Sequence, residues 1–156
     1  MTLQDIGAIG EFVGAFLLFV SLVYVGIQVR HNSVNQRAQI RQDWSNVVVG
    51  WNRYLIENPD LLKAVQLGIT NGFKDLDENQ AAILVIYFQS ALWTFSTLYR
   101  NYLQGLIDDE TWHEVNSLIE RYARSKAFQE YWPGYNKQVG SDFRAFMQET
   151  IDQNAA

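Results

Sequence analysis

The chain of 156 residues contains no cysteine and only two prolines. The absence of cysteine excludes disulfide scaffolds, thiolate zinc sites, cysteine nucleophiles and thiol redox switches. It leaves the cellular compartment open, because cysteine-free proteins occur in every compartment. A chain of this length fits one compact domain, which can bury a substantial core without a disulfide or a metal.

Basic residues are also scarce, with 12 Lys and Arg against 17 Asp and Glu and a formal net charge of −5. A protein that binds nucleic acid through its phosphates needs a clustered excess of Lys and Arg. We therefore expect no nucleic-acid partner.

Catalytic signatures are sparse as well, since the chain has no G-x-S-x-G, no glycine-rich phosphate loop and no H-E-x-x-H. Glu110 and His113 match the Glu-x-x-His step of di-iron bundles, but a full site needs a second such step and two further Glu. The simpler interpretation places Glu110 in the first turn of a helix, where its carboxylate favours the helix dipole, with His113 exposed beside it.

Two other cofactor patterns are incomplete. His31 could be a haem ligand, but no second candidate ligand lies on the same helix. The segment that begins at Asp75 starts like a calcium loop and then lacks the required Gly and the closing Glu. We therefore predict no cofactor, no metal site and no catalytic constellation.

What the sequence does have is one long apolar run, "GEFVGAFLLFVSLVYVGIQVR", from Gly10 to Arg30. Residues 12–29 carry no formal charge, and reading back to Ile6 adds only Glu11 as a charged residue. A helix over 6–29 is about 36 Å long, enough to cross about 30 Å of hydrocarbon. No Lys or Arg precedes the run, unlike in a cleaved signal peptide. We predict a retained transmembrane anchor in residues 1–30; the alternative is a buried helix of a soluble bundle.

The ends of this run carry the charged side chains. Arg30, Arg37 and Arg41 follow it, and the positive-inside rule predicts a periplasmic N-terminus and a cytoplasmic C-terminal domain, with a single pass. Glu11, Arg30 and His31 are the predicted membrane-boundary residues. Glu11 at a helix start favours the positive end of the helix dipole; in the alternative it is a polar handle inside the membrane, paired with a partner helix.

Small residues share one face of the predicted anchor. Gly7, Gly10 and Gly14 are three and four residues apart, and the last two form a G-x-x-x-G step. Such a step lets another helix backbone approach closely. We predict that these three glycines pack a partner span.

The remainder of the chain shows helical periodicity and no strand-like alternation. A stalk helix over 31–57 is predicted to end at Asn58-Pro59, where Asn58 caps a short helix that ends near Asn71-Gly72. Asp77 with Gln80 resembles a capping box for a helix to about Gln104, Asp108 or Asp109 opens another, and a last helix follows "WPG".

The predicted fold is therefore all-α, with one N-terminal transmembrane helix continuing into a cytoplasmic bundle of about four helices in residues 31–156. Four tryptophans are predicted to serve as partner or core aromatics: Trp44, Trp51, Trp112 and Trp132. The neutral run over 81–99 leaves a second crossing open, although its polar side chains favour a core helix.

The N-terminal "IGEFVGAFLLFVSLVYVGIQVRHNS", with "GLIDDETW" and "FQEYWPGY" downstream, resembles a diffuse group of uncharacterised small bacterial single-span membrane proteins. The resemblance covers most of the chain and implies a bacterial inner-membrane setting with the same bundle. It implies no activity for any residue.

The leading functional hypothesis is a membrane-anchored structural or accessory subunit, not an enzyme, whose partners are the lipid bilayer and either copies of itself or a larger membrane complex. The first alternative is a membrane sensor or regulatory adaptor, for which we expect an unbroken helix from about Ile6 to Asn58. The second is a redox or lipid-handling membrane enzyme, which needs a pocket with polar groups near His31 or His113.

Overall fold

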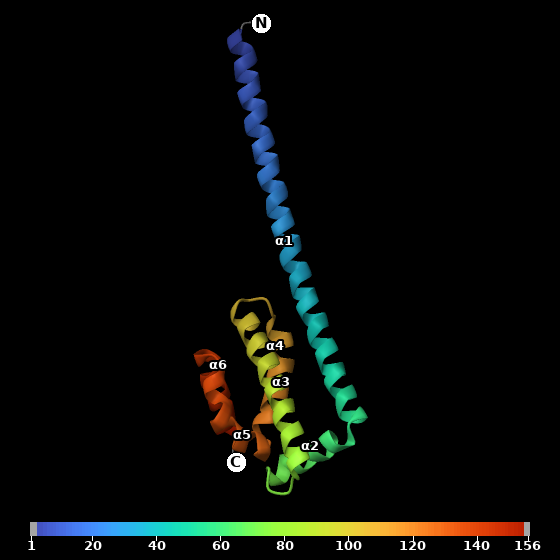
Figure 1. Ribbon diagram of the computed structural model, residues 1–156. Coiled ribbons are helices and arrows are strands. Elements are labelled where there is room, and N and C mark those ends of the chain that lie inside the picture. Colours follow the sequence, from blue (N-terminus) through green and yellow to red (C-terminus); the bar gives the residue numbers. More distant parts are fainter. Residues whose placement is uncertain (1–2, 155–156) are drawn as a thin grey trace. The chain divides into compact units, whose positions relative to one another are not determined.

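The computed structural model describes residues 3–154, with side chains described at residue 7 and over 11–154. The described residues are 89% helical, with no strand among them, which confirms the predicted all-α class. The elements, labelled in Figure 1, are α1 (Leu3–Glu57), α2 (Pro59–Asn71), α3 (Glu78–Leu103), α4 (Asp109–Ala123), α5 (Lys126–Tyr135), a 3-10 turn at Asn136–Gln138 and α6 (Ser141–Asn154).

The chain divides into two units, Met1–Gln39 and Ile40–Ala156. The first is the N-terminal part of α1, which we call the apolar unit. The second, which we call the helical unit, contains the remainder of α1 and all later helices. Each unit is described separately below.

Helix starts in the helical unit follow local capping chemistry. Asp77 accepts a 2.8 Å hydrogen bond from the Gln80 amide, and the Gln80 side chain accepts one of 3.3 Å from the Asp77 amide, which confirms the capping box. Asp108 accepts a 2.8 Å bond from the Thr111 amide and caps α4. Of the two candidates for that cap, Asp108 and Asp109, the structure selects the first.

The start of α2 differs in one detail from the expectation. Pro59 begins the helix as predicted, and Asn58 occupies the cap position. The Asn58 side chain makes no capping bond there; its amide donates instead to the carbonyl of Tyr54, at 2.8 Å. Asn58 is therefore the cap residue of α2 by position, as predicted, but its side chain bonds to the end of α1 instead of to an amide of α2.

A helix that the sequence did not predict, α5, spans the "WPG" segment and contains Pro133. We expected a break there, because proline lacks the amide hydrogen that a helix interior uses. The helix continues because Phe128 and Trp132 are both buried against the core, so tertiary packing outweighs the lost hydrogen bond. Five helices, α2 to α6, therefore follow α1 where about four were expected in the bundle.

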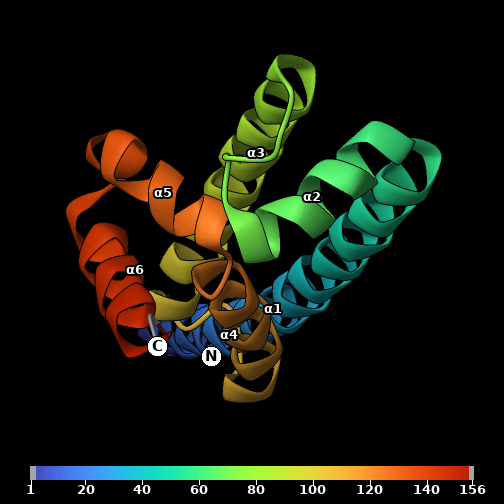
Figure 2. The same ribbon diagram turned by 90° about the horizontal axis from the view of Figure 1, so that it is seen from below.

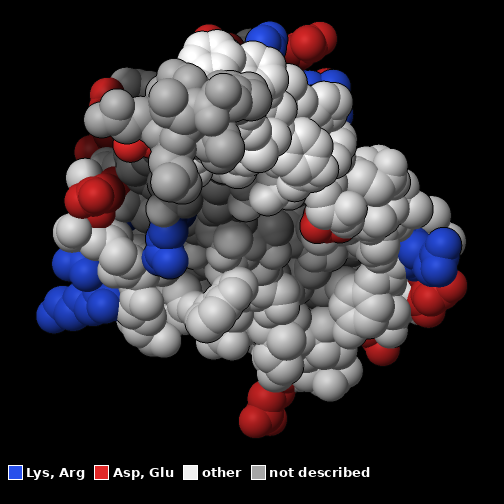
Figure 3. All heavy atoms as spheres, turned by 90° about the horizontal axis from the view of Figure 1, so that it is seen from above, with Lys and Arg blue, Asp and Glu red and all other residues white. Residues whose placement is uncertain are grey.

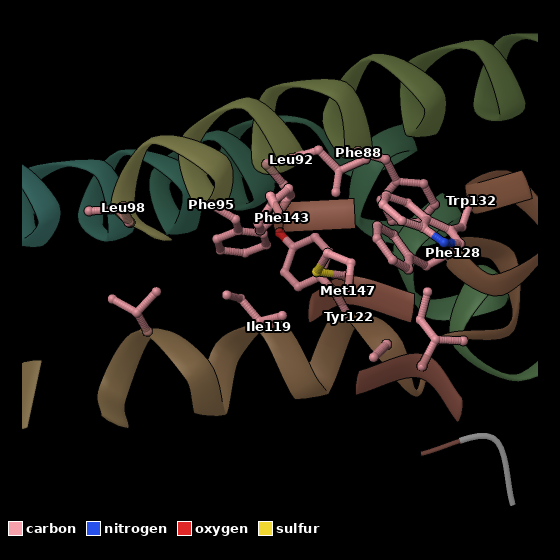
Figure 4. Close-up of a cluster of buried hydrophobic side chains, with 14 of the residues drawn as sticks. Phe88, Leu92, Phe95, Leu98, Ile119, Tyr122, Phe128, Trp132, Phe143 and Met147 are labelled. Atoms are coloured by element: carbon pink, nitrogen blue, oxygen red, sulfur yellow. The ribbon is translucent and has the colours of Figure 1, made fainter. Parts of the chain in front are cut away.

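The core of the helical unit lies between α3, α4, α5 and α6. α2 packs against α3 and α5, and α4 packs against α3, α5 and α6 (Figure 2). Rings dominate the interior: Phe88 and Phe128 meet edge to face with centroids 5.3 Å apart, as do Phe95 and Tyr122 at 5.2 Å. Figure 4 shows this buried cluster, labelled at Phe88, Leu92, Phe95, Leu98, Ile119, Tyr122, Phe128, Trp132, Phe143 and Met147.

Two helices in the described part of the chain are long and apolar enough to cross a membrane: α1, from Glu11 onward, and α3. They differ in burial, since the most apolar window of α1 has no buried residue whereas a third of the α3 window is buried in the core. α3 is therefore a core helix with one exposed side, and α1 is apolar without internal cover.

Candidate functional site

The apolar unit exposes its hydrophobic side chains. Every side chain described over 11–39 is exposed, and Phe12 and Leu22 have 73% and 71% of their surface accessible. In the view of Figure 3, most described atoms are uncharged, and the blue and red atoms form small scattered groups. Large contiguous apolar patches on protein surfaces are typical of interaction sites, whereas scattered exposed apolar residues are ordinary.

Two polar side chains, one in the apolar run and one just after it, find partners on their own helix. The Gln28 amide donates to the Tyr24 hydroxyl at 2.8 Å, and the Ser33 hydroxyl donates to the Val29 carbonyl at 3.1 Å. Such local bonds satisfy groups that a hydrocarbon environment could not. The predicted boundary residues Glu11, Arg30 and His31 are all exposed, at the two ends of this run.

The predicted glycine face has open surroundings. A Cβ added at Gly7 or Gly14 would meet nothing within 4 Å, and the same holds for Gly26 on another side of the helix. Gly10 lies outside the residues whose surroundings the structure describes. The space beside Gly7 and Gly14 is thus sterically free for another backbone.

The four predicted tryptophans all belong to the helical unit's core or its margin. Trp44 and Trp132 are buried, while Trp51 and Trp112 are half-buried and pack against the same core. The fifth, Trp93, has 74% of its surface accessible on α3. It is the tryptophan that sequence reasoning did not single out.

The helical unit also contains a cleft of about 490 Å³ between α2, α3, α4 and the part of α1 after Gln39. We call it the aromatic cleft. Its lining comprises Trp44, Val48, Trp51, Asn52, Leu55, Val65, Ile69, Leu84, Tyr87, Phe88, Glu114, Leu118, Arg121, Tyr122 and Ser125.

Two tryptophans of α1, Trp44 and Trp51, line the aromatic cleft and contact other rings. The Trp51 ring lies edge-on to Phe95 at 5.7 Å and to Trp44 at 6.2 Å between centroids. A ring this size separates helix axes more than an aliphatic side chain does, because interaxial distance follows the side chains at the contact. The cleft is the space that remains beside the tryptophans.

Two tyrosines bring polar atoms into the aromatic cleft. The Tyr122 hydroxyl donates a 2.7 Å hydrogen bond to the Tyr87 hydroxyl. Burial raises the pKa of Tyr87, and it raises that of Tyr122 well above its ordinary value, so both phenols are neutral at physiological pH. Each tyrosine carries one proton, and Tyr122 uses its own in this bond.

The predicted Glu-x-x-His pair lies on the surface of α4, outside the lining of the aromatic cleft. Glu110 and His113 are both exposed on α4, and neither lines the aromatic cleft. Within residues 3–154, no cluster of three or more His, Cys, Asp or Glu side chains could hold a metal ion. The cleft itself was missed from the sequence, because Tyr87, Phe88 and Tyr122 have the spacing of ordinary core residues.

No family model matches the chain, and neither a curated protein nor a solved structure shows significant similarity to it. The resemblance to small bacterial single-span proteins therefore stays an expectation. The features of the protein that bear on its function are the exposed apolar helix and the aromatic cleft.

Proposed function

We propose that this protein is a membrane-anchored accessory subunit. In this proposal, residues 12–29 of α1 cross a bacterial inner membrane, and the helical unit binds copies of the same chain or a larger membrane complex on the cytoplasmic side. The observation that carries the proposal is that every apolar side chain over 12–29 is exposed.

The energetics of that exposure favour a membrane. Burial of a large apolar side chain stabilises by about 1.5–3 kcal/mol. Thirteen such side chains are exposed over 12–29, so their joint transfer from water outweighs the cost of ordering a helix in lipid. A soluble bundle would need a neighbouring helix to cover them.

The proposed orientation rests on charge. Arg30 and Arg37 follow the apolar run and are exposed. Positive side chains near the end of a span favour the cytoplasmic side. In this proposal the helical unit therefore lies on the cytoplasmic side.

A surface on α3 supports a protein partner. Ile86 and Trp93 are seven residues apart, so they share one side of the helix, and they are 62% and 74% exposed. We call this side the outer face of α3. Tryptophan is enriched among the residues that dominate binding energy at interfaces.

One observation favours the sensor or regulatory adaptor as a second candidate. α1 is helical without interruption from Leu3 to Glu57, the feature expected of that class. Replacing Asn35-Gln36 by Gly-Pro would break the helix between the two units. An adaptor loses regulation on this change, whereas a simple anchored subunit keeps its partner.

The test of the proposal uses the absence of native cysteine. The exposed Ser141→Cys provides a single thiol on the helical unit. We expect carbonate-washed membranes to retain the chain, and an impermeant maleimide to label this thiol only after spheroplasts are lysed. Recovery of the full chain in the soluble fraction would overturn the anchor, and labelling of intact spheroplasts would overturn the orientation.

Partner identity is tested by mild solubilisation of native membranes, followed by size analysis and identification of co-purifying chains. Trp93→Ala should release the partner without loss of the anchor. A chain that migrates alone under every mild condition would contradict the accessory-subunit proposal.

A further inference from the structure

We propose that the aromatic cleft binds a long-chain carboxylate, with the hydrocarbon chain between the tryptophans and the carboxylate at the end that carries Asn52 and Arg121. This inference concerns a small-molecule site in the helical unit alone. It is independent of the proposed anchor and of any protein partner.

The walls of the cleft suit an apolar chain. Eleven of its lining residues are aliphatic or aromatic, and they come from four helices. Its volume of about 490 Å³ is within the range of ligand sites, which are usually apolar with a few convergent polar groups. A hydrocarbon chain would cover apolar surface on Trp51 and Ile69 that water otherwise contacts.

Two polar residues of the cleft, Asn52 and Arg121, lie at the same end of it, as the directions of α1 and α4 show. Arg41 pairs with Asp108 at the start of α4, and ten residues later Trp51 contacts Tyr122, with ring centroids 6.5 Å apart. α1 and α4 therefore run in the same direction here. Asn52 and Arg121 consequently lie at the same end of the cleft.

The one carboxylate in the lining lies toward the other end. Glu114 precedes Arg121 by seven residues, or two helical turns of α4, which separates their backbones by about 10 Å. A carboxylate head beside Arg121 thus avoids the repulsion of Glu114. A cationic head beside Arg121 would meet a like charge.

The hydrogen-bond donors in the cleft also favour a ligand whose head group accepts hydrogen bonds. Arg121 offers guanidinium donors, and Asn52 offers an amide. Because the Tyr87 hydroxyl accepts the bond from Tyr122, it can donate its own proton to another acceptor. A carboxylate accepts hydrogen bonds and donates none, so it complements this set of donors.

The experiment uses the full chain in nanodiscs of zwitterionic lipid. A photoreactive octadecanoate with a diazirine near the middle of its chain is bound, activated and mapped by peptide mass spectrometry. We expect labelled peptides that cover 44–55 and 114–125, with labelling suppressed by excess oleate and not by octadecylamine.

Two variants test the head and the chain separately. Arg121→Gln should reduce the affinity of the cleft about tenfold, the loss typical of a charge-assisted hydrogen bond. Ile69→Trp adds a large ring at a half-exposed lining position and should abolish cleft labelling. Their matched controls are Arg100→Gln and Ile86→Trp, which make the same changes at exposed positions of α3 outside the cleft.

All four variants change exposed side chains, and unchanged thermal unfolding checks that each one folds. Labelling confined to residues 11–29 would overturn the site, because it reports only lipid around the anchor. Cleft labelling that Arg121→Gln leaves unchanged, or that octadecylamine suppresses equally, would overturn the carboxylate. Failure of the anchor itself would be evident separately, from loss of the chain from membranes.

Discussion

The Arg41 guanidinium lies 2.5 Å from the carboxylate of Asp108, the same side chain that caps α4 through the Thr111 amide. The ion pair thereby connects α1, just after Gln39, to the start of α4, 67 residues later. Hydrogen bonds from Thr111, assisted by Arg41, lower the pKa of Asp108 from 3.8 to about 2. One carboxylate therefore serves a local and a long-range role.

This pair predicts an acid transition. A carboxylate with a lowered pKa stabilises the fold above its ordinary pKa of 3.8, and the contribution is lost as the pH falls toward about 2. We expect chemical unfolding to show falling stability of the wild type through this window. Asp108→Asn should be less stable at neutral pH and should show a flatter profile between pH 4 and 2.

Arg41→Gln is the matched comparison, because it removes the ion pair and leaves the cap. Both residues of the pair are substantially exposed, so its effect should be small and should fade at high salt. An acid profile of Asp108→Asn that matches the wild type would contradict the assignment.

Gly72 ends α2 with φ at +72°, in a region that side-chain-bearing residues rarely adopt. A Cβ there would also meet the Glu130 carboxylate, which accepts a 2.9 Å hydrogen bond from the Phe73 amide. The ψ of −150° at Gly72 lies in a region that is essentially restricted to glycine, and the added Cβ would displace the Glu130 carboxylate. Gly72→Ala should therefore cost more than the roughly 1–2 kcal/mol of an ordinary left-handed residue.

Gly105→Ala is the control for that variant. Gly105 has φ at +70°, and an added Cβ would meet nothing within 4 Å, so only the conformational cost applies. Urea unfolding measures both free energies. Equal losses at the two glycines would show that the contact with Glu130 contributes nothing.

Phe95 and Trp93 lie on opposite sides of α3. Phe95 is completely buried, and Phe95→Ala should lower the free energy of unfolding by about 3–5 kcal/mol because it leaves a cavity. Trp93→Ala, on the outer face of α3, should change it by less than about 0.5 kcal/mol. A large loss at Trp93 would mean that it stabilises the fold rather than a partner.

Replacing Gly10 and Gly14 by Leu tests the predicted packing of the anchor. No described residue lies within 4 Å of a Cβ added at Gly14, so the helix itself should tolerate the change. Any reduction in the size of the solubilised assembly would then come from a lost neighbouring span. Gly26→Leu, which lies about 100° around the helix from Gly7, should leave the assembly unchanged.

Chemical crosslinking in membranes compares the association of the same variants without detergent. Loss of a crosslinked dimer in the Gly10 and Gly14 variant, with retention in Gly26→Leu, is the expected result. Identical dimer yields in the wild type and both variants would remove the glycine face as a packing surface.

Local chemistry decided the features of this protein that its sequence predicted correctly. The starts of α3 and α4 depend on Asp77 and Asp108, which accept hydrogen bonds from amides three residues later. The start of α2 depends on Pro59, whose ring fixes φ at the first helical position. The apolar character of residues 12–29 likewise needs no knowledge of the remainder of the chain. These features can be predicted because the residues that determine them are close together in the sequence.

Only the tertiary structure decided the rest. α5 continues through Pro133 because Phe128 and Trp132 are buried in a core made by other helices. The Tyr122–Tyr87 bond joins residues 35 apart, and the aromatic cleft is lined by residues of α1, α2, α3 and α4 that are distant in sequence. Periodicity identifies which side chains face inward, but whether they fill the space between helices or leave a cleft depends on the shapes that meet there.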